Sequence, residues 1–354
     1  MNLLFVYPFF LNESALERQW MTPYPPLGLL YLAAAAREAG HAVTVFDATF
    51  ALGDADFVAA MEAHSPDVVC FASLITLRPT ALRLAAIARA RGVVTLAGGP
   101  DPTSSPEAYL SPTPSPSPVE RGRGTGGGEG FDFVIAGEAD DTLLDVLDAL
   151  RFKRATSDIA GIVYRADSSE IIHTAARAPI PDLDRLPFPA RDLIDIPRYL
   201  SAWKSAHGYS SLTIAASRGC PFGCDHCAHS AAGPHWRVRS IANVVCEMTE
   251  LEAVYAPDRF RLVDELDGLG RDWLIELGQA MIDAGVQTPF EGLKPSHLAG
   301  VPMLSEVKDI CAERNVWLPS DSPDAHAAPD LAFDDLLSRW REAKLPAGEH
   351  LNDP

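Results

Sequence analysis

Short apolar segments alternate with amphipathic segments through the first 150 residues, and this alternation limits the fold more than any other feature. The apolar segments predict buried strands over residues 3–7, 42–46, 67–73, 93–97 and 131–136. The segments between them predict helices over residues 26–39, 80–91 and 141–150. Strands that alternate with helices form a parallel sheet covered on both faces. We therefore expect an α/β fold with a doubly wound parallel sheet in residues 1–150.

Glycines follow two of the expected strands. Gly98 and Gly99 come after the strand over 93–97, and Gly137 comes after the strand over 131–136. Ligands of parallel sheets bind beyond the carboxyl ends of the strands, and glycine lets the backbone approach a ligand closely. The same glycines also suit tight turns, and their spacing alone leaves both interpretations open.

Two stretches of unusual composition divide the chain. Residues 111–130 combine Ser-Pro repeats with an Arg/Gly run, which cannot build a core, and we expect a disordered insertion in a surface loop. Residues 151–211 predict a hairpin, over 159–165 and 170–174, followed by a proline-rich, extended connector. A further domain is then expected over residues 212–354.

Three of the six cysteines, Cys220, Cys224 and Cys227, lie within eight residues, directly after an expected strand over 212–216. Three thiolates on one loop can converge on one metal centre. Structural zinc usually takes four protein ligands, and a nearby histidine (His226, His229 or His235) could be the fourth. Four-iron clusters are usually held by four cysteines, so three would leave one iron open to a ligand. The other cysteines, Cys70, Cys246 and Cys311, are expected to be buried thiols.

The stretch from Ser217 to Cys227 resembles the cluster loop of radical S-adenosylmethionine (SAM) enzymes. The resemblance implies that Cys220, Cys224 and Cys227 hold a [4Fe-4S] cluster whose open iron binds S-adenosyl-L-methionine. Reductive cleavage of that cofactor would then yield a 5′-deoxyadenosyl radical. The residues expected near SAM are Phe222, His226, Asp264 and Glu265. His226 departs from the pattern, because the family usually has an aromatic residue just before the third cysteine.

The length of the second domain sets a limit on this resemblance. Only 127 residues follow Cys227, fewer than a six-unit barrel needs, and the helix and strand pattern loosens after residue 293. We therefore expect a partial, shortened (β/α) radical SAM barrel over residues 212–354. A degenerate, non-catalytic homologue stays open.

The first 150 residues resemble the cobalamin-binding domain that precedes the radical domain in one large subgroup. The matching stretches are Tyr24–Leu29, Ala97–Thr103 and Gly137-Glu138. Members often have a histidine where Asp101 stands. The resemblance implies cobalamin contacts from the loops after three strands, by Ser73, Leu74, Thr76, Gly98, Gly99, Pro100, Gly137 and Glu138.

The subgroup resemblance implies an enzyme, a cobalamin-dependent methyltransferase that acts on an unactivated centre of a small molecule. It would also need an electron donor such as flavodoxin or ferredoxin. The alternatives are a radical SAM enzyme that performs cyclisation or rearrangement, a non-catalytic cobalamin- or cluster-binding protein, and a zinc protein.

Composition narrows the class of partner. The net charge of −19 argues against nucleic acid as a partner. No apolar run approaches the ~20 residues of a membrane span. The amino terminus lacks the pattern of a signal peptide, so we expect a cytoplasmic protein.

Overall fold

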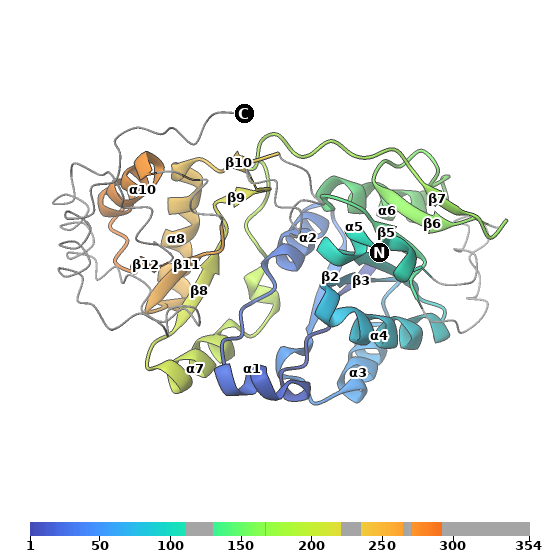
Figure 1. The fold of residues 1–354 in the computed structure, drawn as a ribbon, viewed down its shortest axis with the longest axis horizontal. Helices are drawn as coiled ribbons and strands as arrows, with labels where there is room; N and C mark the ends of the chain where they lie inside the picture. Colours follow the sequence, from blue (N-terminus) through green and yellow to red (C-terminus); the bar gives the residue numbers. More distant parts are fainter. Residues whose placement is uncertain (111–129, 167, 221–234, 265–268, 270, 292–354) are drawn as a thin grey trace, which may run out of the picture. The chain divides into compact units, whose positions relative to one another are not determined.

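The computed structural model describes residues 1–110, 130–166, 168–220, 235–264, 269 and 271–291. The chain divides into two compact units (Figure 1). The first unit holds Met1–Ala206 together with Gly219–Arg237, and the second holds His207–Arg218 together with Val238–Pro354. Gly219 and Cys220 therefore belong to the first unit, although the segment His207–Arg218 that precedes them in the sequence belongs to the second.

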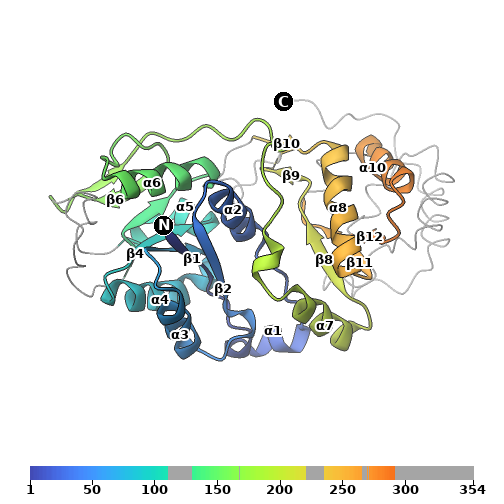
Figure 2. The same cartoon turned by 180° about the vertical axis from the view of Figure 1, so that it is seen from behind.

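The first unit is built on a seven-stranded sheet of order β2-β1-β3-β4-β5-β6-β7 (Figure 2). Its first five strands are parallel: β1 (Asn2–Tyr7), β2 (Ala42–Asp47), β3 (Val68–Ala72), β4 (Val94–Gly98) and β5 (Phe133–Ile135). The carboxyl ends of neighbouring parallel strands meet at one edge of the sheet, so the loops after β3, β4 and β5 lie side by side.

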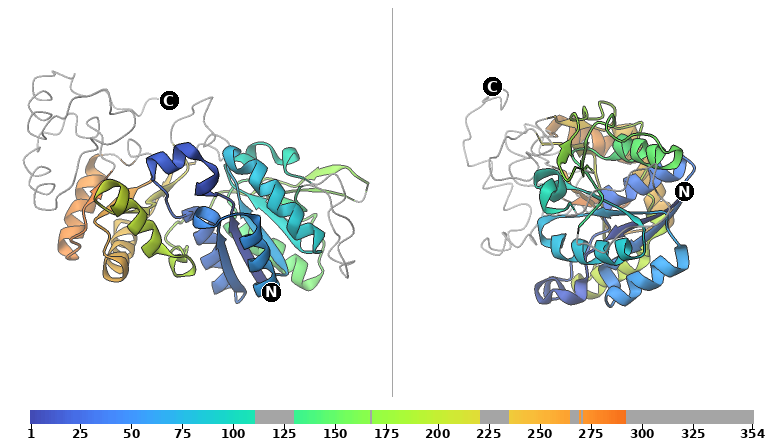
Figure 3. Two further views of the ribbon diagram at one scale, coloured as in Figure 1. Left: turned by 90° about the horizontal axis from the view of Figure 1, so that it is seen from below. Right: turned by 90° about the vertical axis from the view of Figure 1, so that its right-hand side faces the viewer.

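Helices cover both faces of this sheet (Figure 3). On one face, α2 (Leu27–Glu38) and α6 (Asp140–Phe152) bury Leu29, Leu143 and Leu147. On the other face, α3 (Asp54–His64) and α4 (Arg78–Ala90) bury Phe57 and Leu84. Because both faces are covered, the strands are apolar almost throughout. The expected doubly wound sheet is confirmed.

Short helical elements fill the connections of the first unit. They are η1 (Leu11–Glu13), α1 (Ala15–Trp20), η2 (Ala48–Phe50), η3 (Ile75–Leu77), α5 (Pro100–Ser104), η4 (Pro106–Ala108) and η5 (Arg191–Leu193). Ser14 caps α1, since its side chain accepts a hydrogen bond from the backbone N–H of Glu17 at 3.2 Å. Gly40 follows the carboxyl end of α2 and has a φ of +83°, in the left-handed region that favours glycine after a helix.

The stretch after α6 differs from the expectation. The predicted hairpin exists as β6 (Ile162–Arg165) and β7 (Ile171–His173), but it extends the main sheet, with β6 antiparallel to β5. The connector was expected to be extended after the hairpin. Its last part instead forms helix α7 (Ile196–His207).

Helix α7 is fixed to the first unit by two buried aromatic residues. The Trp203 indole N–H donates to the carbonyl oxygen of Pro23 at 2.7 Å. The Tyr199 hydroxyl lies 2.6 Å from Oδ2 of Asp47, and burial raises the pKa of that carboxyl. Both aromatic side chains therefore serve packing, which favours a structural role for the connector residues over a substrate-lining one.

The described part of the second unit is a three-stranded parallel sheet of order β12-β11-β8. Its strands are β8 (Ser211–Ile214), β11 (Arg259–Leu262) and β12 (Phe290–Glu291), and its helices are α8 (Ile241–Tyr255) and α10 (Arg271–Asp283). This order of strand, helix and strand is that of the first units of a (β/α) barrel. A two-residue strand pair, β9 (Ser217–Arg218) with β10 (Arg237–Val238), flanks the cysteine-bearing segment in the sequence.

The expected disordered insertion and the chain beyond residue 291 lie outside the described residues. Within the described ranges, every helix is too short or too polar to cross a bilayer.

Candidate functional site

Three loops form the carboxyl edge of the parallel sheet, over residues 73–77, 98–104 and 136–139. Hydrogen bonds join each loop to the next. The backbone N–H of Ser73 donates to the carbonyl of Gly98 at 2.9 Å. The backbone N–H of Gly137 donates to Oγ1 of Thr103 at 3.1 Å. The structure thus brings together the loops that the sequence predicted to bind a ligand.

Gly99 lets two of these loops approach each other. Its φ is +116°, and a Cβ at this position would lie 2.5 Å from the carbonyl oxygen of Ser73. Any other residue would push the β3 and β4 loops apart. Gly137 differs, because its φ of +95° favours glycine while a Cβ there would meet no atom of the described residues within 4 Å. Among these residues, the backbone at Gly137 therefore borders open space.

Apolar side chains are exposed on the first loop of this edge. Leu74 is 44% exposed and Ile75 is 70% exposed, and Thr76 beside them is exposed as well. Exposed large apolar residues next to glycine-bearing turns mark this edge as a candidate ligand-binding surface. Gly98 and Pro100 are half-buried on the neighbouring loop.

A polar network lies beneath the first two loops. The Arg78 guanidinium donates two hydrogen bonds to Asp101, at 2.8 Å to Oδ2 and 2.6 Å to Oδ1. The Tyr109 hydroxyl lies 2.5 Å from Oδ2 of Asp101 and 2.8 Å from Oγ of Ser73. Hydrogen bonds from Arg78 hold the pKa of Asp101 below its usual range, whereas burial raises the pKa of Tyr109 to about 12. At neutral pH, Asp101 is ionised and Tyr109 is protonated.

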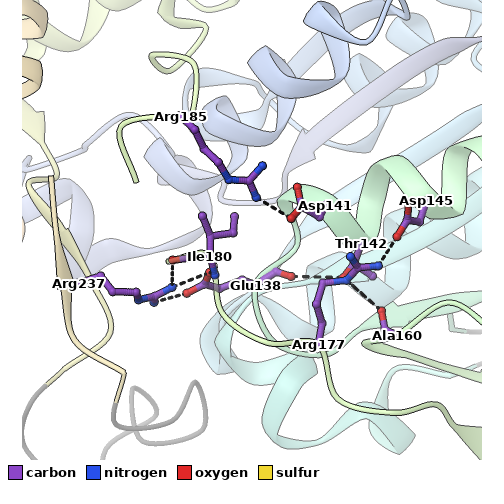
Figure 4. A network of polar contacts seen from close by, with 9 residues as sticks. All are labelled: Glu138, Asp141, Thr142, Asp145, Ala160, Arg177, Ile180, Arg185 and Arg237. Atoms are coloured by element: carbon purple, nitrogen blue, oxygen red, sulfur yellow. Dashed lines mark hydrogen bonds and ion pairs between the residues drawn. The ribbon is translucent and has the colours of Figure 1, made fainter. Parts of the chain in front are cut away.

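The third loop carries Glu138, whose carboxylate is turned toward protein groups (Figure 4). It accepts hydrogen bonds from the backbone N–H of Ile180 at 2.9 Å and from the Arg237 guanidinium. The sequence predicted a cofactor contact for Glu138. In the structure its side chain binds Ile180 and Arg237.

Only part of the predicted cluster site can be placed. Cys220 is described and buried, whereas Cys224, Cys227, Phe222, His226 and Glu265 lie outside the described residues. Gly219, at φ +86°, precedes Cys220, and a Cβ on Gly219 would overlap with the carbonyl oxygen of His235. The described residues at the two ends of the cysteine-bearing segment, Gly219 and His235, therefore lie against each other.

The other cysteines that the structure describes differ from each other. Cys70 is buried, and burial raises the pKa of its thiol to about 12, which makes it unreactive. Cys246 is exposed on α8, so the expectation of a buried thiol was wrong there. Cys311 lies outside the described residues.

Asp264, predicted to lie near SAM, follows β11 in the second unit. Its carboxylate accepts a hydrogen bond from the backbone N–H of Ala216 at 2.8 Å and another from the Ser217 hydroxyl. Burial raises the pKa of this carboxyl. Asp264 thus holds the residues that lead into the cysteine-bearing segment.

Comparisons with known proteins agree with this geometry. Residues 21–117 match the B12 binding domain family. The chain is 28% identical over 290 residues to an uncharacterized methyltransferase of Pyrococcus horikoshii, covering 81% of this chain and 58% of the relative. It is 24% identical over 339 residues to a cytidylyl-2-hydroxyethylphosphonate methyltransferase of Streptomyces wedmorensis, covering 82% of this chain and 60% of the relative.

Two solved structures share the fold. One is the cobalamin-dependent SAM radical enzyme OxsB with aqua-cobalamin and SAM bound, with a TM-score of 0.66, 16% identity, and coverage of 89% of this chain and 42% of that one. The other is the radical SAM methyltransferase TsrM of Kitasatospora setae, with a TM-score of 0.64, 18% identity, and coverage of 91% of this chain and 60% of that one.

This chain contains a match to the B12 binding domain and shares its fold with solved cobalamin-dependent radical SAM enzymes. The B12 match contains the first loop of the sheet edge and the Gly98–Gly99 turn, and the relatives extend the likeness beyond it. The chain spans 58% of the length of the Pyrococcus relative and 50% of the length of a Synechocystis cyclase relative.

Two arginines of this chain have roles that the sequence did not reveal. Arg78 pairs with Asp101 across 23 residues, and Arg237 pairs with Glu138 across 99 residues. Asp101 stands where cobalamin-binding relatives often have a histidine, and Arg237 follows the cysteine motif in the sequence. Neither position identifies its ion-pair partner.

Removal of the Asp101 charge should destabilise the chain in a pH-dependent way. We expect Asp101→Asn to lower the free energy of unfolding by about 1–3 kcal/mol at pH 7, because it leaves the half-buried Arg78 without its buried carboxylate partner. The folded-state pKa of Asp101 is lowered, so its contribution is full above the unfolded pKa of about 3.9 and is lost as the pH falls through the folded pKa. Urea unfolding from pH 7 to acid checks this.

Asp54→Asn is the matched control, since Asp54 pairs with Arg83 at an exposed site. It should cost less than about 1 kcal/mol. An equal effect of the two substitutions at pH 7 would contradict the role given to Asp101.

The close approach of the β3 and β4 loops predicts a difference between two glycines. Gly137→Ala should cost about 1–2 kcal/mol, because the positive φ is strained for alanine while space is free. Gly99→Ala should cost more than about 3 kcal/mol, because the added Cβ also clashes with the backbone of Ser73. Thermal and urea unfolding of both variants would measure the difference, and similar values would refute the clash.

Proposed function

We propose that this chain is a radical SAM enzyme that binds a [4Fe-4S] cluster, S-adenosyl-L-methionine and cobalamin, and that it transfers a methyl group to an unactivated centre of a small molecule. One observation carries the proposal: a cysteine motif of the radical SAM type lies in the same chain as a sheet edge whose first two loops fall within the B12 binding domain match.

The residues present fit these cofactors. Cys220, Cys224 and Cys227 supply three thiolates, a donor set that suits an iron–sulfur cluster with one open iron. The sheet edge offers Ser73, Leu74, Thr76, Gly98, Gly99, Pro100 and Gly137 to a large planar ligand. Gly137 borders open space, and Leu74 has a free apolar surface. Cobalamin supplies methyl-transfer chemistry when bound, whereas the protein positions the reactants and excludes water.

Methyl transfer is favoured by the names of several relatives. They include the phosphonate methyltransferase of Streptomyces wedmorensis and a hopanoid C-3 methylase of Methylococcus capsulatus, which is 26% identical over 270 residues. Their substrates share no chemical class, so the relatives support the reaction type and leave the substrate of this chain undefined.

A second function has its own support. Two relatives are named anaerobic magnesium-protoporphyrin IX monomethyl ester cyclases, from Synechocystis and Rubrivivax gelatinosus. A non-methylating radical reaction is therefore the alternative. Stoichiometric cobalt in the purified protein would favour methyl transfer, and SAM cleavage by a cobalt-free protein would favour cyclisation or rearrangement.

Either reaction requires a one-electron donor to reduce the cluster. A flavodoxin or ferredoxin is the partner class we propose, because these proteins deliver single electrons at low potential. A compartment that keeps thiols reduced, the cytoplasm, suits a cluster held by cysteines.

The deciding experiment is reductive cleavage of S-adenosyl-L-methionine. The full chain is purified anaerobically, reconstituted with iron, sulfide and cobalamin, and reduced, and 5′-deoxyadenosine is quantified. We expect Cys224→Ala to lower its formation at least about tenfold, because the cluster loses one of its three ligands. The matched control is Cys246→Ala, which removes an exposed thiol outside the motif and should change the rate by less than about twofold.

The outcomes separate the hypotheses. Cluster formation without deoxyadenosine in the wild type would indicate a non-catalytic homologue. Equal loss of deoxyadenosine in both cysteine variants would contradict the assignment of the motif.

A further inference from the structure

Glu138 joins three segments of the first unit that are distant in sequence (Figure 4). It lies in the turn between β5 and α6. Its Oε2 accepts a hydrogen bond from the backbone N–H of Ile180 at 2.9 Å and one from Arg237 Nη1 at 3.0 Å, and its Oε1 accepts one from Arg237 Nη2. Nη1 of Arg237 also donates to the carbonyl oxygen of Ile180 at 2.7 Å.

The burial and geometry of this pair distinguish it from a surface ion pair. The side chains of Arg237 and Glu138 are 13% and 16% exposed. A guanidinium that binds both carboxylate oxygens in a fork has a fixed orientation, which Lys or a single hydrogen bond would not provide. The backbone of Ile180 closes the arrangement from a third side. The Glu138 carboxylate is therefore held facing Arg237 and Ile180.

Arg237 ends the segment Gly219–Arg237, which begins at the residue before Cys220. The contact of Gly219 with His235 brings the two ends of this segment together. A residue that fixes Arg237 therefore fixes the described ends of the segment that carries the cysteine motif. The opposite end of the ion pair lies next to Gly137, on the sheet edge given above to cobalamin.

We propose that Glu138 is a positioning residue that fixes the cysteine-bearing segment, through Arg237, to the third loop of the sheet edge. It acts on the spacing between the two cofactor sites and does not itself hold cobalamin. This inference rests on the proposed function for its purpose, because the spacing matters only if both cofactors bind. The ion pair itself can be tested without either cofactor.

The same network supplies a matched control. Asp141 lies on the first turn of α6 and pairs with Arg185 at 2.6 Å, but its side chain is 39% exposed and that of Arg185 is 45% exposed. Asp141→Asn removes one carboxylate charge close to Glu138 in the sequence without touching Arg237. If the loss of a negative charge were enough to change the measured properties, Asp141→Asn would change them as well.

The first test is hydrogen exchange of the full chain without cofactors. Glu138→Gln and Arg237→Gln should each raise amide exchange about fivefold or more at residues 178–182 and 235–239, because each removes the charge-assisted bonds. Exchange in α4 should stay unchanged, as should both regions in Asp141→Asn. Glu138→Gln and Arg237→Gln each break the same ion pair, so if one of them fails to fold, the other still tests it. Unchanged exchange at 235–239 in the variants would overturn the proposal.

The second test separates positioning from direct binding. By titration with aqua-cobalamin, Glu138→Gln and Arg237→Gln should bind within about threefold of the wild type. A loss of affinity of about tenfold or more in Glu138→Gln, with none in Arg237→Gln, would make Glu138 a ligand and overturn the inference.

The third readout is spectroscopic. In the reconstituted protein, the reduced cluster speeds the magnetic relaxation of paramagnetic cobalt according to their separation. Microwave power saturation should therefore change in both Glu138→Gln and Arg237→Gln, and should match the wild type in Asp141→Asn. An unchanged value in all three variants would contradict the positioning role. A wild type that binds neither cofactor would defeat the proposed function while leaving the exchange test of the pair intact.

Discussion

The parallel register of β1, β3, β4 and β5 is the constraint on which the cofactor edge depends. Parallel strands turn all their carboxyl ends to one side, so the loops after β3, β4 and β5 have to share that side. Gly99 then lets the first two loops touch, and the hydrogen bond from Gly137 to Thr103 adds the third. A site is thus assembled from segments that are dispersed over the chain.

Two arginine–carboxylate ion pairs hold the loops of this edge in place. The Arg78–Asp101 pair, with Tyr109, ties the start of α4 to the turn after β4. The Arg237–Glu138 pair ties the third loop to the end of the cysteine-bearing segment. Both carboxylates lie within two residues of a glycine of the edge, and both are directed toward arginines. The acidic groups thus fix the loops, whereas Leu74 and Ile75 stay exposed at the edge.

The sequence allowed the fold to be predicted wherever the signal is local. The buried strands and the helices α2, α4 and α6 show continuous apolar runs or a helical period, and the expected ranges match the structure to within a few residues. Helix α7 was missed because prolines dominate the stretch before it, although Pro197 lies in the first turn of the helix, where proline is tolerated. The hairpin was predicted, but its attachment to β5 depends on a long-range pairing without a sequence pattern.

The site was predictable only in part, for the same reason. Glycines at strand ends and the cysteine spacing are local patterns, and they located the edge and the motif. The arginine partners of Asp101 and Glu138 are 23 and 99 residues away, so no spacing could identify them. Only the folded chain shows that Glu138, expected beside a cofactor, binds Arg237.

The central claim is that one chain carries an iron–sulfur cluster and cobalamin together. Electron paramagnetic resonance of the reduced, reconstituted protein tests it most directly, combined with iron, sulfide, cobalt and zinc analysis of the same sample. The account predicts iron and cobalt on the same chain and a cluster signal that shifts when S-adenosyl-L-methionine is added. Zinc in place of iron, or a cluster signal that does not change when S-adenosyl-L-methionine is added, would contradict this claim.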